Sequence, residues 1–184
     1  NRHTRDALGE QGVIDTLFRP YTKKMWGLEL EDIDPNIINR IPVRDDDNEH
    51  YFPNDRYQYL PKNGYTAMVA QILDHQNISV NLGTAFRVSL EKDYSHVFNS
   101  MPIDEYFDSV YGPLPYRSIK FTHTTFPTST LFPTATTNFT HSGPVTRVTE
   151  WRHLPNHGEH RFLTALTFEE PCDYRDNNYE RYYP

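Results

Sequence analysis

Arginines are the residues of this chain best suited to holding an anion. Arg40 and Arg44 flank Pro42 on a segment expected to be extended, so both side chains can point the same way. Arg147 lies inside a predicted strand, where a charge is unusual unless it faces water or has a partner. Converging guanidiniums suit a diphosphate, because each can bind a pair of oxygens. The alternative is that they are solvated or form ion pairs with nearby acids, namely Asp45, Asp46, Asp47 and Glu150.

Aromatic rings form a second group of candidate binding residues. Tyr21 and Trp26 follow the helix break or kink expected at Pro20. Rings at the end of a helix usually pack inward, but a ring with a polar tip also stacks on a base or a sugar. The spacing alone leaves both uses open.

Three histidines raise the question of a zinc site. His153, His157 and His160 bracket a predicted turn at Asn156–Gly158, so they need not share a face. The sequence has no H-E-x-x-H motif and a single cysteine, Cys172. We therefore predict no metal, and interpret these histidines as the exposed tip of a hairpin.

Composition narrows the classes of partner and compartment. The net charge of −7, without a long basic run, argues against a nucleic acid or an anionic membrane surface as partner. No apolar run reaches the length of a membrane span, so we predict no membrane insertion. A lone cysteine suits a reducing compartment, and we expect a cytoplasmic location. Because the chain begins at Asn1 with a helix already under way, we expect a piece of a longer protein.

The elements that must position these residues change in type along the chain. Helical spacing runs from Thr4 to Trp26, and again over 65–75 and 102–110. Short strands are predicted over 57–60, 79–89 and 95–99. After Pro115 the period becomes two, which predicts an antiparallel meander with strands over 117–126, 134–140, 145–154 and 161–169. The order indicates an α+β fold with an α/β-like insert.

A series of short motifs resembles bacterial UDP-galactopyranose mutases in order and nearly in spacing. The motifs cover almost the whole chain, and their combination is more specific than any one of them. They are Tyr21-Thr22-x-Lys24-x-Trp26-Gly27, Arg40-Ile41-Pro42-Val43-Arg44, Asp55-Arg56-Tyr57-Gln58, Pro61-x-x-Gly64-Tyr65-Thr66, Pro102-Ile103-Asp104-x-Tyr106-Phe107-Asp108, Tyr116-Arg117-Ser118-Ile119-Lys120-Phe121, Asn138-Phe139-Thr140, Thr146-Arg147 and Tyr182-Tyr183-Pro184.

The resemblance implies parts of three subdomains. Residues 1–45 would be the end of a helical substrate-binding subdomain with a mobile loop, and 46–65 the start of an antiparallel sheet subdomain. Residues 66–112 would be a returning α/β segment of a flavin-binding domain, and 113–184 most of the sheet. The glycine-rich G-x-G-x-x-G motif of such a domain does not occur in the sequence.

The resemblance also implies a reaction, a cofactor and a biological role. Members of the family are isomerases that interconvert UDP-galactopyranose and UDP-galactofuranose, a precursor of cell-surface polysaccharides. The N5 atom of reduced FAD attacks the anomeric carbon and UDP leaves, so no side chain is expected to act as the nucleophile. The partner is then a UDP-sugar, and a homodimer is one arrangement that the resemblance allows.

Site residues carried over by motif all belong to substrate binding. Tyr21 would stack on uracil with Phe18 and Thr22 beside it, and Trp26 would lie near the sugar. Arg40 would close over the substrate on its loop, and Arg147 would hold the diphosphate together with the hydroxyls of Tyr51 and Tyr183. Arg117 and Asn138 are further candidates at the sugar end.

Several positions depart from the family pattern. Pro20 and Met25 stand where the family usually has Gly and Gln, and Ser100-Met101 where it has Thr-Gly near the flavin. These departures motivate an alternative function, a mutase-like protein that binds a nucleotide sugar or a glycan without catalysis. For the 184-residue chain by itself we expect no catalysis and little flavin binding.

Overall fold

The computed structural model describes residues 2–36, 46–48, 50, 52–157 and 160–183. The chain divides into two compact units. One consists of residues 1–58 and 116–184, and the other of residues 59–115. The first unit holds the amino-terminal helices and the sheet, and the second contains only helices and loops. The subdomain identities expected from the resemblance stay predictions.

The amino-terminal helical run consists of three joined pieces. These are α1 (Arg2–Val13), a π-helical turn η1 (Ile14–Phe18) and α2 (Arg19–Trp26). Pro20 lies in the first turn of α2, but η1 runs directly into that turn, so the proline has no N–H to donate to a carbonyl of the preceding turn. The kink expected at the proline is therefore a change of helix type in the turn before it. Gly27 ends α2 in the left-handed region, with φ of 71°.

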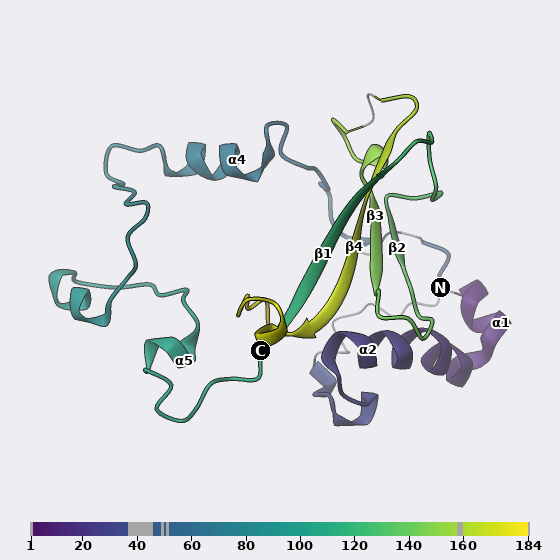
Figure 1. Ribbon diagram of the computed structural model, residues 1–184, viewed down its shortest axis with the longest axis horizontal. Coiled ribbons are helices and arrows are strands. Elements are labelled where there is room, and N and C mark those ends of the chain that lie inside the picture. Colours follow the sequence, from purple (N-terminus) through teal and green to yellow (C-terminus); the bar gives the residue numbers. More distant parts are fainter. Residues whose placement is uncertain (1, 37–45, 49, 51, 158–159, 184) are drawn as a thin grey trace. The chain divides into compact units, whose positions relative to one another are not determined.

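Four antiparallel strands form the sheet of the first unit (Figure 1). The strands are β1 (Arg117–Phe126), β2 (Thr136–Asn138), β3 (Arg147–Glu150) and β4 (Thr164–Asp173), in the spatial order β1-β4-β3-β2. All four predicted strands are present, and with the helices they make an α+β fold. The predicted meander is wrong in one respect, because β1 lies outside β4 instead of beside β2.

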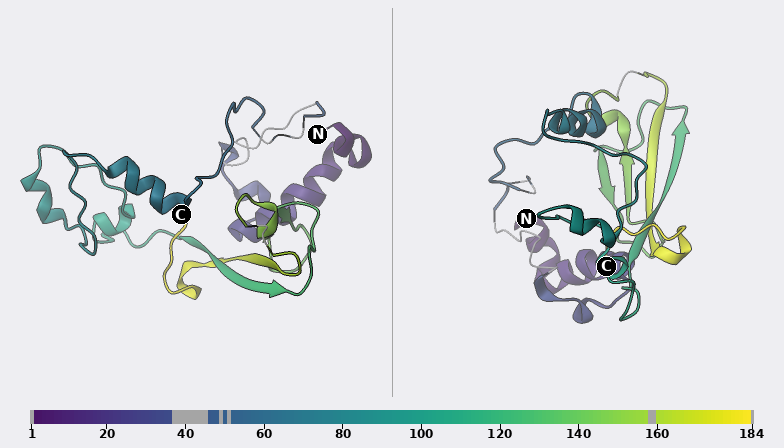
Figure 2. Two further views of the ribbon diagram at one scale, coloured as in Figure 1. Left: turned by 90° about the horizontal axis from the view of Figure 1, so that it is seen from above. Right: turned by 90° about the vertical axis from the view of Figure 1, so that its left-hand side faces the viewer.

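The core of the sheet is small and partly polar. Val148 and Leu166 are 1% and 2% exposed, and they lie on the same face as the buried carboxylate of Glu150. The helix α2 contacts β4, and Figures 1 and 2 show it at the end of the sheet where β2 turns into β3. The residues of α2 and of this end of the sheet therefore come close together.

The second unit contains α4 (Gly64–Leu73), the short helix η3 (Val88–Asp93) and α5 (Ile103–Tyr106). Residues 59–115 are all described, and they contain no strand. The strands predicted over 57–60, 79–89 and 95–99 are therefore wrong. A strand needs a neighbouring strand to complete its ladder of hydrogen bonds, and none of these segments pairs with another.

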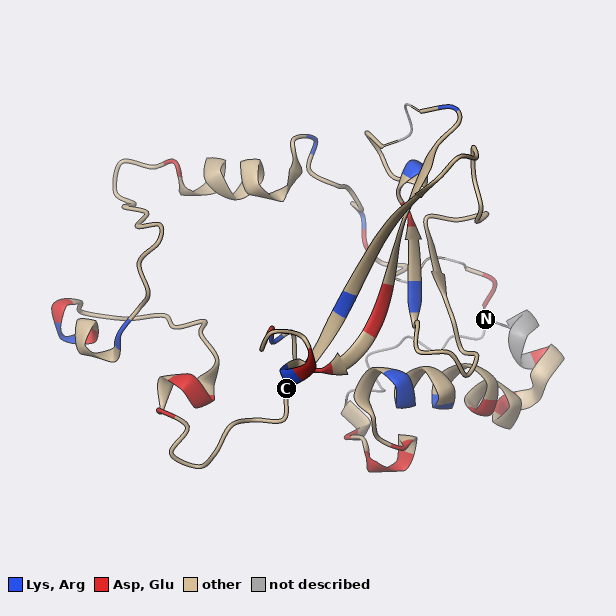
Figure 3. Ribbon diagram, in the orientation of Figure 1, with Lys and Arg blue, Asp and Glu red and all other residues tan. Residues whose placement is uncertain are grey.

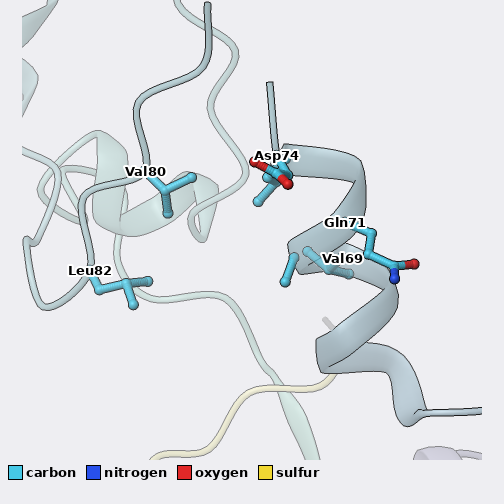
Figure 4. Close-up of a pocket in the computed structure, with 7 residues that line it drawn as sticks. Val69, Gln71, Asp74, Val80 and Leu82 are labelled. Carbon is cyan, nitrogen blue, oxygen red and sulfur yellow. The ribbon is translucent and has the colours of Figure 1, made fainter. Parts of the chain in front are cut away.

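The helix predicted over 65–75 is confirmed by α4, but its apolar side chains are not packed inward. Met68, Ile72 and Leu73 keep 38%, 66% and 36% of their surface exposed. A hollow of about 450 Å³ lies between α4 and the segment around Val80 and Leu82 (Figure 4). Its lining is largely apolar and contains no basic residue, so it does not suit a diphosphate. Within the described ranges no helix combines the length and apolarity that crossing a bilayer requires.

Candidate functional site

The helix α2 carries four of the residues predicted to bind a ligand. Phe18 directly precedes the helix, and Tyr21, Thr22 and Trp26 follow at three- and four-residue intervals, which places them along one side. All four are half-buried. The indole of Trp26 meets the ring of Tyr183 edge to face, with 4.9 Å between the ring centres. The amino-terminal helix and the end of the chain thus share one aromatic contact.

Arg117 joins the start of β1 to the end of α2. Its Nε donates a hydrogen bond to the carbonyl oxygen of Met25 at 3.0 Å, and its Nη2 to that of Lys24 at 3.3 Å. The Arg117 backbone also pairs with Tyr183, whose carbonyl oxygen accepts from the Arg117 N–H at 2.7 Å. Three predicted site residues, Trp26, Arg117 and Tyr183, are therefore neighbours.

Arg147 lies in a cross-strand row with two polar residues. The register pairs it with Asn138 of β2 and with Glu169 of β4, and directly paired residues share a face of the sheet. The Nε atom of Arg147 is 3.4 Å from a carboxylate oxygen of Glu169. Figure 3 shows basic positions on β1 and β3 on either side of an acidic stretch of β4. Glu150, considered above as an ion partner of Arg147, lies on the opposite face.

Three other predicted site residues influence the pKa of the Tyr183 phenol. Burial raises its pKa, the positive charges of Arg117 and Arg147 act in the opposite direction, and Tyr21 adds to the rise. These ionisable groups therefore lie within range of one another's charge. Direct contacts join Tyr183 to Trp26 and Arg117, and Asn138 lies beside Arg147, whereas Tyr21 and Arg147 are near enough to influence the pKa of Tyr183.

The remaining predicted residues divide into two groups. Phe18 and Thr22 lie on the same helical side as Tyr21, so they belong to the same neighbourhood. Arg40 and Tyr51 lie outside the described residues. The role of each residue towards a ligand stays a prediction.

Lys24 contributes to this region in a way that the sequence reading missed. Its ammonium donates to the carbonyl oxygens of Phe139 at 2.6 Å and Val145 at 2.8 Å. Burial lowers the pKa of Lys24. Its place in the Tyr21–Gly27 motif was the available signal, but a contact with backbone oxygens of the sheet has no local signature.

Glu150 is a buried carboxylate that organises the loop before β2. It is fully buried and accepts hydrogen bonds from the N–H groups of Leu131 (3.0 Å) and Phe132 (2.7 Å) and from the hydroxyl of Thr164 (2.6 Å). Burial alone raises the pKa of this carboxyl, but its hydrogen bonds, with Thr164 foremost, outweigh burial and lower it. Glu150 therefore serves the fold near Arg147 and does not face the same side.

The histidines have separate partners. His153 Nε2 lies 2.8 Å from the carbonyl oxygen of Phe132 and 3.4 Å from Glu150, whereas His157 stacks at a tilt on Trp151. Over the part of the chain that the structure describes, no three His, Cys, Asp or Glu side chains form a metal-binding group.

Comparison with known proteins places these residues in a family. A family model described as UDP-galactopyranose mutase matches residues 16–184. The "Probable UDP-galactopyranose mutase" of Klebsiella pneumoniae is 40% identical over 114 residues, which cover 62% of this chain and 29% of that protein. The UDP-galactopyranose mutase of Mycoplasma genitalium is 31% identical over 187 residues, covering 95% of this chain and 46% of that protein.

A relative with another named substrate is about equally similar. The dTDP-fucopyranose mutase of Escherichia coli is 31% identical over 177 residues, covering 92% of this chain and 47% of that protein. The chain thus spans less than half the length of each of these relatives. The family model covers all the predicted site residues, from Phe18 to Tyr183. The chain therefore belongs to the UDP-galactopyranose mutase family.

Proposed function

We propose that the full-length protein interconverts UDP-galactopyranose and UDP-galactofuranose. The observation that carries the proposal is the contact between Trp26 and Tyr183, with Tyr21 and Arg147 near enough to influence the pKa of Tyr183, inside the region that matches the family. Aromatic rings and a guanidinium in this region supply a stacking surface and a diphosphate ligand, which are the two requirements of a nucleotide sugar.

Each residue of the site has a proposed part in binding. Tyr21 stacks on uracil, with Phe18 and Thr22 beside it, and Trp26 faces the sugar. Arg147 and Tyr183 bind the diphosphate. Arg40 and Tyr51 are further candidates for binding the diphosphate, and Arg117 and Asn138 are further candidates for binding the sugar.

Arg147 contributes to the rate as well as to binding. When the bond between the anomeric carbon and the diphosphate breaks, negative charge grows on the departing UDP. A guanidinium already aimed at those oxygens stabilises the transition state more than the bound substrate. Its ion-pair partner Glu169 lies on the same face of the sheet, so the diphosphate would compete with that carboxylate for the guanidinium.

The family is generally flavin-dependent, and reduced FAD would supply the nucleophile of the reaction. The residues described here fit the nucleotide-sugar side of that chemistry. They do not fit the diphosphate of a dinucleotide, because the sequence has no glycine-rich turn that could receive it at a helix terminus. We therefore assign the residues of this chain to binding and orienting the substrate.

The test uses the full-length protein with reduced FAD and UDP-galactopyranose. Conversion to the furanose is followed by chromatography, with a matched reaction in which the flavin is left oxidised. We expect product only with reduced flavin. No furanose, together with no conversion of dTDP-fucopyranose or other nucleotide sugars, would reject the mutase function.

A second candidate function is binding of a nucleotide sugar without catalysis. Met25 and Met101 favour it, because they replace smaller or polar residues that the family has near the sugar and the flavin. Pro20, the third departure, is accommodated within the helical run, where the turn before it is π-helical. UDP binding by a full-length protein that does not retain flavin would support this second function over the first.

A further inference from the structure

The last turn of α2 presents backbone carbonyl oxygens that the helix itself leaves without partners. Arg117 donates to two of them, those of Met25 and Lys24, at 3.0 and 3.3 Å. A cation at this end of a helix is also favoured by the helix dipole. The guanidinium of Arg117, which belongs to the sheet, thus holds the helix.

Lys24 makes the reverse connection. It belongs to the helix, and its ammonium donates to the carbonyl oxygens of Phe139 and Val145, at 2.6 and 2.8 Å. Those two residues lie on either side of the turn that joins β2 to β3. Removing an ammonium from water is costly unless it is well hydrogen-bonded, so these contacts have to be specific to be kept. Two cations therefore fasten α2 to the start of β1 and to the connection between β2 and β3.

We propose that Lys24 and Arg117 are positioning residues, which fix α2 on the sheet so that the ring of Tyr21 and the guanidinium of Arg147 fit the two ends of one UDP group. This inference rests on the proposed function. It gives Arg117 a part that needs no contact with the sugar. We refer to these two residues and their four carbonyl contacts as the clamp.

The covalent linkage of UDP explains why the clamp matters for affinity. Uracil and diphosphate belong to one molecule, so a site at the correct spacing gains from both ends at once. A loosened helix leaves each end able to bind but loses this gain. Loss of the clamp should then weaken UDP much more than it weakens pyrophosphate alone.

The experiment measures binding of UDP and of pyrophosphate to the full-length protein by titration calorimetry or ligand-detected NMR. The variant is Lys24→Met, which keeps the apolar stem and removes the ammonium. The matched control is Lys23→Met on the same helix, because Lys23 is exposed and pairs with the nearby, exposed Glu29. We expect Lys24→Met to raise the Kd for UDP about tenfold, which is about 1.4 kcal/mol, and that for pyrophosphate less than about twofold. Lys23→Met should change neither.

If Lys24→Met does not fold, a second pair of variants at Arg117 tests the same positioning role. Arg117→Gln removes the cation on the sheet side, and Arg117→Lys restores a charge, so UDP affinity should fall in the first and recover in part in the second. Wild-type affinity for UDP in both Lys24→Met and Arg117→Gln would overturn the positioning role alone. An equal loss of UDP and pyrophosphate affinity would also overturn it, because Lys24 would then act as a direct ligand. Failure of the wild-type protein to bind UDP would instead reject the proposed function, and the clamp's role with it.

Discussion

Replacing Glu150 by methionine should release the loop at residues 130–132 from the sheet. Glu150 is completely buried, and its carboxylate accepts from the backbone N–H groups of Leu131 and Phe132. Methionine has a similar length but cannot accept these bonds well, so two backbone donors lose their acceptor. A donor left unsatisfied costs about 1–3 kcal/mol, and because Leu131 is itself exposed the low end applies, giving about 2 kcal/mol for the two loop donors; the buried hydroxyl of Thr164 also loses its acceptor.

Glu150→Gln separates the lost hydrogen bonds from the change in packing. The amide can turn its NH₂ group towards Thr164, whose hydroxyl is able to accept, and keep its oxygen on the loop. Only the charge is then lost, and about 1 kcal/mol is expected because bonds to charged groups are stronger than neutral ones. A graded order of wild type, Gln and Met therefore follows from the geometry.

Hydrogen exchange of the full-length protein provides the measurement. Peptides that contain Leu131 and Phe132 should exchange about 30-fold faster in Glu150→Met, since about 1.4 kcal/mol corresponds to a factor of ten. Glu180→Gln, on an exposed side chain, is the matched control and should leave this exchange unchanged. Exchange within about threefold of wild type in Glu150→Met would refute the reasoning, as would equal effects of Met and Gln.

Further predictions concern pH, the helix end, the ion pair and the cofactor. The pKa of Glu150 is lowered in the folded state from its ordinary value of 4.5, so its contribution to stability is full above pH 4.5 and is lost as the pH falls through the folded pKa. The Glu150→Gln variant has no such loss. If urea is first used to give both proteins the same stability at pH 7, acid unfolding followed by circular dichroism should begin at a higher pH in wild type than in Glu150→Gln. Gly27→Ala should lower the free energy of unfolding by about 1 kcal/mol, because alanine resists a positive φ, while its Cβ would lie at an ordinary 3.6 Å from Arg117; an unchanged urea midpoint would contradict this. Glu169→Gln should strengthen UDP binding about twofold to fivefold, since it removes the carboxylate that competes with the diphosphate for Arg147; weaker binding in a titration would show that Glu169 is needed to orient the guanidinium. The purified 184-residue chain should show no flavin absorbance, and a yellow preparation would contradict our assignment of its residues to the substrate side alone.

Local patterns were sufficient to predict the regular elements of the first unit. Alternating side chains after Pro115 predicted β1 to β4, and helical spacing predicted the run that ends at Trp26. These features depend on residues a few positions apart, so the chain itself encodes them. Parity along a strand also shows that Arg147 and Glu150, three residues apart, lie on opposite faces, which excludes their pairing.

The middle segment shows where local patterns fail. Apolar residues over 79–99 have the composition of strands, but a strand forms only where another strand supplies its hydrogen-bond partners. Residues 59–115 contain no such pair. The alternation of apolar and polar residues therefore predicted strands that the structure lacks. For the same reason, a local pattern cannot show which strand pairs with which, so it did not predict that β1 lies beside β4.

Sequence motifs were enough to nominate Tyr21, Arg147 and Tyr183 and to indicate the family, because their order and spacing are properties of the chain. Tertiary structure alone decided that Arg147 faces Glu169, that Arg117 binds carbonyl oxygens of α2 while Lys24 binds those between β2 and β3, and that Glu150 holds a distant loop. The physical reason is that backbone carbonyl and N–H groups are the same at every position. Which of them a side chain reaches depends on the register of strands and the docking of a helix, and those are set by the packing of the whole unit.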